Sequence, residues 1–275
     1  MAAALAGVMT VSMSATAFAA DDDGYILKAT NEDSKSSDND LVIAIEGSVS
    51  SMDPANIPDT NAISATRGVY ETLVSFDENQ ELTGKLAESW EVSDDSLTYT
   101  FKLRQGVKFQ DGTDFNAAAV KANYDRVVNK DNNLRQRRTF IVTNEDGSET
   151  PRVDSIETPD DYTLVIKLTQ AWAPFINRLT QFCIISPAAL EEYGNDIMNH
   201  PCGTGPYVCT EWEEGDHTSF ERNDDYWGDK PGVDTVTIKE FRKQVHVQLC
   251  FRQVKQISSI LHHLTRLKQS KEQTM

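Results

Sequence analysis

Hydrophobic and polar residues alternate over residues 97–104, and this alternation predicts a half-buried β-strand. A short segment at 90–92 and a polar turn at 93–96 precede it, so the stretch is predicted to form a β-hairpin. One side of the strand is expected to face a core and the other solvent. The inward residues are Leu97, Tyr99, Phe101 and Leu103, and the outward residues are Thr98, Thr100, Lys102 and Arg104.

A helix is predicted directly after this hairpin. Asp111 and Gly112 turn the chain, and Asn116 stands where a helix N-cap belongs, because its side-chain oxygen can accept a bond from an amide of the first turn. Apolar residues then recur at helical spacing, at Val120, Tyr124, Val127 and Val128. Hairpin, turn and helix make a compact α/β unit in which no residue suggests catalysis.

The chain before this unit is predicted to contain a strand, a helix and a short hairpin. Residues 41–45 form an almost uninterrupted apolar run, which suits a strand in the interior of a sheet. A helix is expected over 60–73, and the short hairpin over 74–76 and 81–82. The residues of the helix expected to face the core are Ile63, Val69, Tyr70 and Leu73.

The chain after this unit is predicted to alternate between hairpins and short helices. Polar residues dominate 127–150, so we expect surface loops there. Each of the two expected helices has a proline near its first turn, where a missing amide costs least. The expected elements are hairpins at 153–158 with 162–168 and at 207–212 with 217–221, helices at 174–182 and 187–193, and a last strand at 233–239.

Length and charge narrow the class of protein. A chain of 275 residues can bury a sizeable core as one large or two ordinary domains. Its formal net charge of −17 argues against a nucleic-acid partner, since a polyanion would be repelled.

The N-terminal segment indicates export. Residues 2–20 are small, apolar and uncharged, and Ala17-Phe18-Ala19 is an A-x-A cleavage signal. We therefore expect a signal peptide over 1–20, cleaved near Ala19 or Ala20. Residues 21–40 are acidic and poor in apolar groups, which predicts a flexible linker.

The composition changes abruptly near residue 241. Residues 240–275 hold seven basic and two acidic residues, whereas the preceding part carries a formal charge of −22. We therefore divide the chain into a body over 41–241 and a basic tail over 242–275. The tail has two alternative explanations: a frameshift product, or a basic amphipathic helix that docks on anionic lipid or on a partner.

No sequence motif points to an enzyme, a cofactor or a metal centre. The G-x-S-x-G, HExxH, P-loop and G-x-G-x-x-G patterns are absent from the sequence. His200, Cys202 and Cys209 invite a metal hypothesis, but structural zinc sites usually show tighter cysteine pairs and a fourth ligand. A Cys202–Cys209 disulfide and free buried thiols are the other two alternatives. Trp90, Trp212 and Trp227 are interpreted as packing residues, and Trp172 as a residue that packs or borders a ligand.

Several segments, in the right order, resemble the family 5 extracellular solute-binding proteins, the peptide-type receptors of ABC importers. The resemblance runs from Leu41 to about Phe241. It implies an α/β fold of the class II periplasmic-binding-protein type, with a mixed sheet, hairpins and flanking helices, of which this chain holds the first lobe only. The segments that carry it are SMDPA (51–55), VYETLVSFDENQEL (69–82), LAESWEVSDD (86–95), LTYTFKLRQGVKF (97–109), DGTDFNAAAVKANYDRV (111–127), PDDYTLVIKL (159–168), ISPAALEEYG (185–194), CGTGPYVCTEWEEGD (202–216) and NDDYWG (223–228).

The loop after the first strand is the candidate binding site. Ligands in α/β sheets bind beyond the carboxyl ends of strands, where loop amides and hydroxyls converge. In the family the matching loop borders the peptide cleft, and a plain surface loop is the alternative. The residues concerned are Glu46, Gly47, Ser48, Val49 and Ser50.

The resemblance implies a function as well as a fold. It implies a monomeric binding protein without a cofactor that captures short peptides outside the cytoplasmic membrane and delivers them to an ABC permease. Family members are roughly twice as long, so we expect the chain to bind peptide weakly or not at all. The alternatives are a module that docks on membrane or permease, and a receptor for another solute such as nickel or a sugar.

Overall fold

The structure, a computed structural model, describes residues 39–241. Within this range no helix has the length and apolar composition that a membrane span requires. The predicted signal peptide and basic tail lie outside the described residues, as does the acidic linker up to residue 38, and these stay predictions. Asp40, the last residue of the predicted linker, is instead the first residue of a strand, where it pairs with Thr235.

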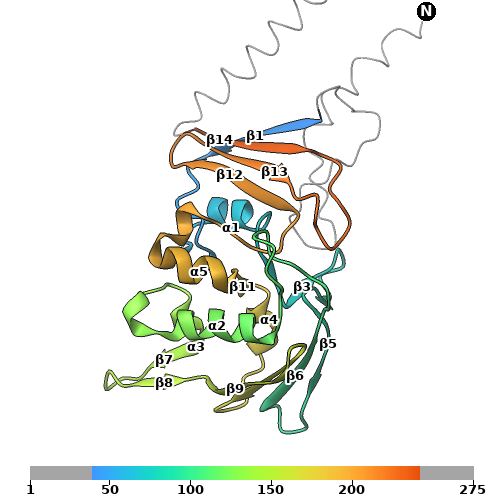
Figure 1. The fold of residues 1–275 in the computed structure, drawn as a ribbon. Coiled ribbons are helices and arrows are strands. Elements are labelled where there is room, and N and C mark those ends of the chain that lie inside the picture. Colours follow the sequence, from blue (N-terminus) through green and yellow to red (C-terminus); the bar gives the residue numbers. More distant parts are fainter. Residues whose placement is uncertain (1–38, 242–275) are drawn as a thin grey trace, which may run out of the picture.

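Two four-stranded sheets dominate the fold (Figure 1). The first sheet is mixed, because β1 runs parallel to β14 while the other pairs are antiparallel. The second sheet is antiparallel throughout. In spatial order the first consists of β1 (Asp40–Glu46), β14 (Thr235–Phe241), β13 (His217–Arg222) and β12 (Tyr207–Glu213), and the second of β5 (Ala87–Val92), β6 (Thr98–Leu103), β10 (Thr163–Leu168) and β9 (Val153–Asp160).

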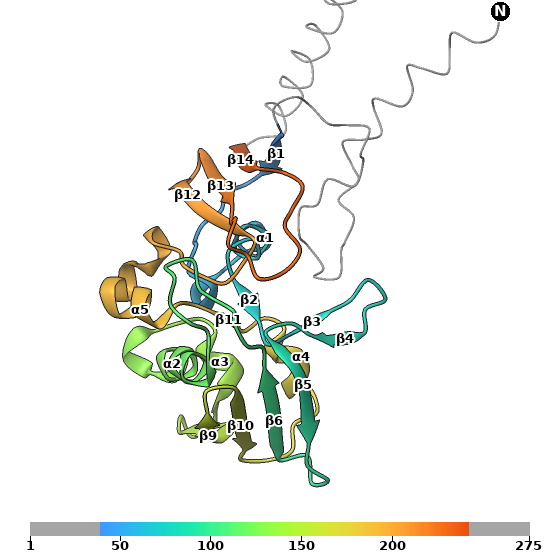
Figure 2. The ribbon, with the colours of Figure 1, turned by 45° about the vertical axis from the view of Figure 1, so that its right-hand side comes forward.

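Helices and three small strand pairs lie between and beside these sheets (Figures 1 and 2). The helices are α1 (Thr60–Thr66), α2 (Ala117–Val128), α3 (Arg137–Phe140), α4 (Phe175–Leu179) and α5 (Pro187–Tyr193), with 3-10 turns η2 (Pro54–Asn56), η3 (Lys130–Asn132) and η4 (Gly194–Asn199). The strand pairs are β2 (Glu71–Thr72) with β11 (Cys183–Ile184), β3 (Val74–Phe76) with β4 (Leu82–Gly84), and β7 (Ile141–Thr143) with β8 (Glu149–Pro151).

The predicted hairpin–turn–helix unit is confirmed and belongs to the larger hydrophobic core, which we call the second-sheet core. β5 and β6 pair as expected, and Phe101 is fully buried between neighbouring strands. The Asn116 side chain accepts a hydrogen bond from the Ala119 amide at 2.9 Å and so caps α2. Val120 and Val127 face this core from the helix.

A second cluster, the first-sheet core, packs the mixed sheet against α1 and α5. Its buried members include Met52, Ala65, Tyr70 and Ile238. Cys202 packs against both cores, and the backbone next to it leaves no room for a side chain: a Cβ on Gly203 would lie 2.1 Å from the Val69 carbonyl oxygen. The short helix at 187–193 is confirmed, and so are both later hairpins and the last strand.

Two details of the first-sheet core differ from the prediction. The helix expected over 60–73 ends at Thr66, because the carbonyl groups of Gly68 and Val69 accept bonds from Tyr207 and Gly205, which hold this stretch in a non-helical conformation. Ile63, expected to face the core, is 41% exposed. A backbone pairing with a distant segment has overridden the local helical pattern.

β1 also differs, because it is not in the sheet interior. Among the described residues it pairs with β14 alone, and Val42 is 61% exposed. Leu41, Ile43 and Ile45 are half-buried against the first-sheet core. An apolar run therefore does not distinguish a central strand from an edge strand that packs on one face.

Residues 127–150 hold more structure than the predicted loops. They contain η3, α3 and β7, and β8 starts at their end. Arg137 explains part of this order: its guanidinium binds both Glu149 carboxylate oxygens, at 2.7 and 2.8 Å, and donates to the Val128 carbonyl at 2.9 Å. The expected helix at 174–182 is shorter, over α4 alone.

Removing the ring of Phe101 should test the second-sheet core. We expect Phe101→Ala to lower the free energy of unfolding by about 3–5 kcal/mol, because the deletion leaves a cavity in a fully buried site. Denaturant unfolding followed by circular dichroism measures this loss. Val92→Ala is the control, since Val92 is 45% exposed on the neighbouring strand; an equal loss in both variants would contradict the assignment.

Candidate functional site

The predicted binding loop lies where β1 and β14 end, and several of its backbone groups are hydrogen-bonded within the protein. The Gly47 amide donates to the Phe241 carbonyl at 3.0 Å. The buried Val49 donates its amide to Glu240 at 2.9 Å and accepts a bond from the Trp212 indole at 2.9 Å. The Glu46 backbone carbonyl accepts a hydrogen bond from the Asn61 side-chain amide at 2.9 Å. These contacts hold the loop in place.

The side chains of this loop are arranged differently. Ser50 donates a short hydrogen bond to Asp59, the residue that caps α1. Ser48 is half-buried and Glu46 is exposed. None of the five loop residues lines the pocket described next. Their contact with a ligand stays a prediction.

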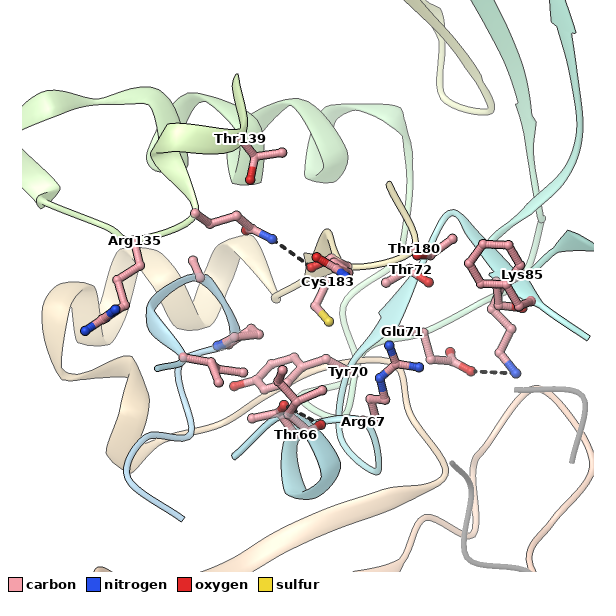
Figure 3. A pocket seen from close by; sticks show the side chains of 18 of the residues that line it. Thr66, Arg67, Tyr70, Glu71, Thr72, Lys85, Arg135, Thr139, Thr180 and Cys183 are labelled. Atoms are coloured by element: carbon pink, nitrogen blue, oxygen red, sulfur yellow. Dashed lines mark hydrogen bonds and ion pairs between the residues drawn. The ribbon is translucent and has the colours of Figure 1, made fainter. Parts of the chain in front are cut away.

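A pocket of about 440 Å³ lies where α1, β2, β3 and α3 approach one another (Figure 3). α1 contributes Ile63 and Thr66, and the chain around α3 forms the opposite wall. Most of its polar lining is uncharged, with hydroxyl and amide groups from Thr66, Thr72, Ser75, Gln80, Gln136, Thr139, Thr180 and Gln181.

Tyr70 forms part of the pocket wall and is only 2% exposed. Burial, and to a lesser degree the nearby Asp53 charge, raises the pKa of its phenol well above the usual value. Its hydroxyl and the Ser75 hydroxyl have no hydrogen-bond partner among the described residues. The phenol therefore stays protonated and serves as packing surface at neutral pH.

The charged lining of the pocket is mainly cationic. It comprises four cations, Arg67, Lys85, Arg135 and Arg138, and one carboxylate, Glu71. Figure 3 places Arg67 and Lys85 near Glu71 and Arg135 on the opposite side. Arg135 and Arg138 are exposed.

Glu71 is buried and its carboxylate is fully engaged. One oxygen accepts from Tyr226 at 2.7 Å and lies 3.3 Å from the Lys85 ammonium. The other accepts from Thr204 and from the Trp227 indole, both at 2.7 Å. The carboxylate is thus neutralised and hydrogen-bonded within the protein, and it is not available to bind a ligand cation.

A second buried ion pair, between Arg126 and Asp53, holds the chain segment next to the pocket lining. Arg126 of α2 binds both carboxylate oxygens of Asp53, at 3.2 and 2.7 Å. Asp53 also accepts from the Ala55 amide at 3.0 Å and so caps η2. Pro54 and Ala55, which line the pocket, are thereby fixed against α2.

The three described cysteines are free thiols. Cys183 lines the pocket, and burial raises its pKa to about 11. Burial likewise raises the pKa values of Cys202 and Cys209 to about 12. The structure therefore corresponds to the free-thiol alternative.

Among the residues that the structure describes, His200, Cys202 and Cys209 do not form a metal-ligating group. The group that does converge is Glu213, Asp216 and His217, whose ligand atoms lie within 4.8 Å of one another at the β12–β13 turn. His217 is hydrogen-bonded to Asp216, which raises its pKa.

The tryptophans are packing residues. Trp212 packs against the first-sheet core, and Trp90 and Trp227 against the second-sheet core, as predicted. The Arg152 guanidinium carbon lies over the Trp172 ring, 4.2 Å from the ring centroid. Trp172 does not line the pocket. Of the two alternatives for Trp172, packing or bordering a ligand, the structure shows packing against the second-sheet core.

Sequence reasoning missed the residues that give the pocket its charge. Arg135 and Arg138 stand in the stretch LRQRR, which was interpreted as a polar loop. The available signal was the run of arginines in an acidic chain. Glu71 carried no signal, since its partners lie 14 to 156 positions away along the chain.

Comparison with protein families links this fold to a group of receptors. The family described as "Bacterial extracellular solute-binding proteins, family 5 Middle" matches residues 81–273, a range that runs past residue 241 into the basic tail. The glutathione-binding protein GsiB of Salmonella typhi is 40% identical over 201 residues, which are 72% of this chain and 37% of GsiB. GsiB of Shigella dysenteriae is 37% identical over 236 residues, 84% of this chain and 40% of that protein.

Solved structures agree with this likeness. The periplasmic binding protein DppA of Helicobacter pylori, in complex with the peptide STSA, superposes with a TM-score of 0.65 at 30% identity, over 78% of this chain and 45% of DppA. NikZ of Campylobacter jejuni, in complex with Ni(L-His), superposes with a TM-score of 0.69 at 26% identity, over 79% of this chain and 42% of NikZ. The periplasmic-binding-protein-like fold is confirmed, and the chain spans about two fifths of the length of the curated relatives named here.

Neutralising Glu71 tests the buried network. We expect Glu71→Gln to lower the free energy of unfolding by about 3 kcal/mol, because Lys85 then loses its buried counter-charge. Chemical unfolding measures the change. Glu88→Gln is the control, since Glu88 is exposed on β5; a loss below about 1 kcal/mol in Glu71→Gln would match a surface ion pair instead.

The pKa of Cys183 predicts slow alkylation of this pocket thiol. With a pKa of about 11, only about 0.1% of the thiol is ionised at pH 8, and the thiolate is the reactive species. The iodoacetamide rate should therefore still rise about tenfold per pH unit between pH 8.5 and 10, whereas the denatured chain approaches its plateau. Mass spectrometry of the Cys183 peptide measures both; a plateau in the folded protein would contradict the shift.

Proposed function

The chain belongs to the bacterial extracellular solute-binding proteins, family 5, and from this premise we propose that it captures short peptides for an ABC permease. The observation that carries the proposal is the 440 Å³ pocket between the two cores. Its volume falls in the range of small-molecule sites, and its hydroxyl and amide groups suit the donors and acceptors of a peptide backbone. Capture needs no covalent chemistry.

The relatives support a peptide as the ligand class. GsiB is named a glutathione-binding protein, and glutathione is a tripeptide. DppA was solved with the peptide STSA. Both proteins extend well beyond the region shared with this chain.

Binding in the proposed mechanism is coupled to closure. A ligand that touches two lobes stabilises the closed state in proportion to its extra contacts there. The chain supplies one wall, formed by residues between Pro54 and Cys183. We therefore propose that the isolated chain binds peptide weakly, since the ligand makes only part of its contacts.

Location and partners follow from the same proposal. The chain is exported after cleavage near Ala19 or Ala20, acts as a monomer and passes its peptide to a permease in the cytoplasmic membrane. The A-x-A signal at 17–19 supports export.

A metal chelate is the second candidate ligand. NikZ was solved with Ni(L-His), in which an amino acid accompanies the metal. The pocket offers a protonated Cys183 and a fully engaged Glu71, so a bare ion would find few ligands. A chelate that brings its own ligands needs only shape and charge from the protein.

Peptide titration tests the proposed function. We expect glutathione and di- to hexapeptides to shift backbone amide signals of the α3 and 180–183 segments in NMR spectra, with millimolar dissociation constants. Signals around the exposed β7–β8 hairpin, which does not line the pocket, serve as the internal control. Micromolar affinity in calorimetry would contradict weak binding, and unchanged spectra with every peptide would contradict peptide capture.

A further inference from the structure

The charge of the pocket is opposite to that of the chain. The protein carries a formal net charge of −17, whereas the charged residues that line the pocket sum to +3. A cationic cavity in an acidic protein concentrates anions locally and repels cations. The ligand of such a pocket is expected to be anionic.

Two arginines of the α3 wall have no partner among the described residues to neutralise them. Neither Arg135 nor Arg138 makes an ion pair or a side-chain hydrogen bond with any described residue, and both line the pocket. Arg137 differs, because Glu149 and the Val128 carbonyl hold its guanidinium away from the pocket. Gln136, bonded to the Gln181 carbonyl at 2.7 Å, anchors the same segment.

The anchored backbone keeps both arginines at the edge of the pocket. Arg135 lies in the turn that precedes α3 and Arg138 in the helix itself, and both line the same pocket. Two guanidinium groups so placed can bind one carboxylate together, or two carboxylates of one ligand, through paired N–H···O bonds.

The pocket offers little to a ligand ammonium group. Glu71 is the one carboxylate among its lining residues, and Lys85, Thr204, Tyr226 and Trp227 already engage it. Cationic peptides would therefore meet unbalanced positive charge, while acidic peptides would meet two open guanidinium groups.

We propose that this pocket selects peptides that carry carboxylates, and that Arg135 and Arg138 bind these groups; the proposal rests on the proposed peptide-binding function. Binding then weakens with added salt, because the contacts lie at a solvent-exposed edge. The carboxylate comes from an acidic side chain or from the peptide C-terminus.

Matched probes and variants test this selectivity in the full chain by NMR titration. The probes are the tripeptides Glu-Ala-Glu, Gln-Ala-Gln and Lys-Ala-Lys, each with a free or an amidated C-terminus, and the dianion glutarate. The variant is Arg135→Gln with Arg138→Gln. Arg178→Gln is the control, since Arg178 is exposed on α4 and does not line the pocket.

We expect the wild-type chain to bind amidated Glu-Ala-Glu about tenfold or more tightly than amidated Gln-Ala-Gln, which carries no carboxylate, since one charge-assisted pair is worth at least that factor. The double variant should lose this preference and keep its affinity for amidated Gln-Ala-Gln, whereas Arg178→Gln should behave as wild type. Amidation distinguishes the C-terminal carboxylate from side-chain carboxylates as the bound group.

The outcomes separate this inference from the proposed function. Equal binding of all tripeptides, whether their C-terminus is free or amidated, or an unchanged preference in the double variant, would overturn anion selection while peptide capture stands. Arginine-dependent binding of glutarate without binding of any peptide would support the anion site and overturn peptide capture. Absence of binding by every probe would overturn both.

Discussion

A single buried carboxylate, Glu71, ties together the parts of this structure. It lies on β2 between the two cores and accepts bonds from Thr204, Tyr226 and Trp227, while Lys85 supplies the counter-charge. Removing a carboxylate from water is costly unless its oxygens are hydrogen-bonded and its charge is paired. The connection at 203–206, the loop between β13 and β14 and the segment before β5 must therefore meet at one point. This requirement fixes the first-sheet core relative to the second-sheet core.

The same constraint gives the pocket its electrostatic character. Because Glu71 is neutralised internally, it does not offset the arginines on the opposite wall. The buried pair of Asp53 and Arg126 also leaves the positive charge of the pocket unchanged. The Asp53 carboxylate is paired with Arg126 of α2 and does not line the cavity. These two carboxylates are thus paired within the protein, whereas Arg135 and Arg138, which have no ion-pair partner among the described residues, line the pocket. The acidic surface of the chain and its cationic pocket are consistent with each other.

Local pattern predicted the elements whose packing partners are close in sequence. The β5–β6 hairpin, α2 with its Asn116 cap, α5 and the β9–β10 hairpin all follow from periodicity and turn residues over a few positions. Prediction was wrong where a distant segment decided the outcome. Residues 68–70 leave the helical conformation because 205–207 hydrogen-bond to them, and β1 is an edge strand because its only partner among the described residues is β14. The order within 127–150 depends on Arg137 reaching Glu149, which no short-range pattern reveals.

The sequence by itself determined the fold class, the family and the acidic character of the chain, since these follow from residue order and composition. It also placed a candidate loop at 46–50, whose role as a ligand contact stays a prediction. Only the tertiary structure decided where the pocket lies and which charges it contains. A charged side chain can bind a ligand only if folding leaves it without a partner in the protein. The partners of a side chain can be distant in sequence, as Glu71 and Trp227 are. Sequence shows that the arginines are present, but only the folded chain shows which of them remain available to a ligand.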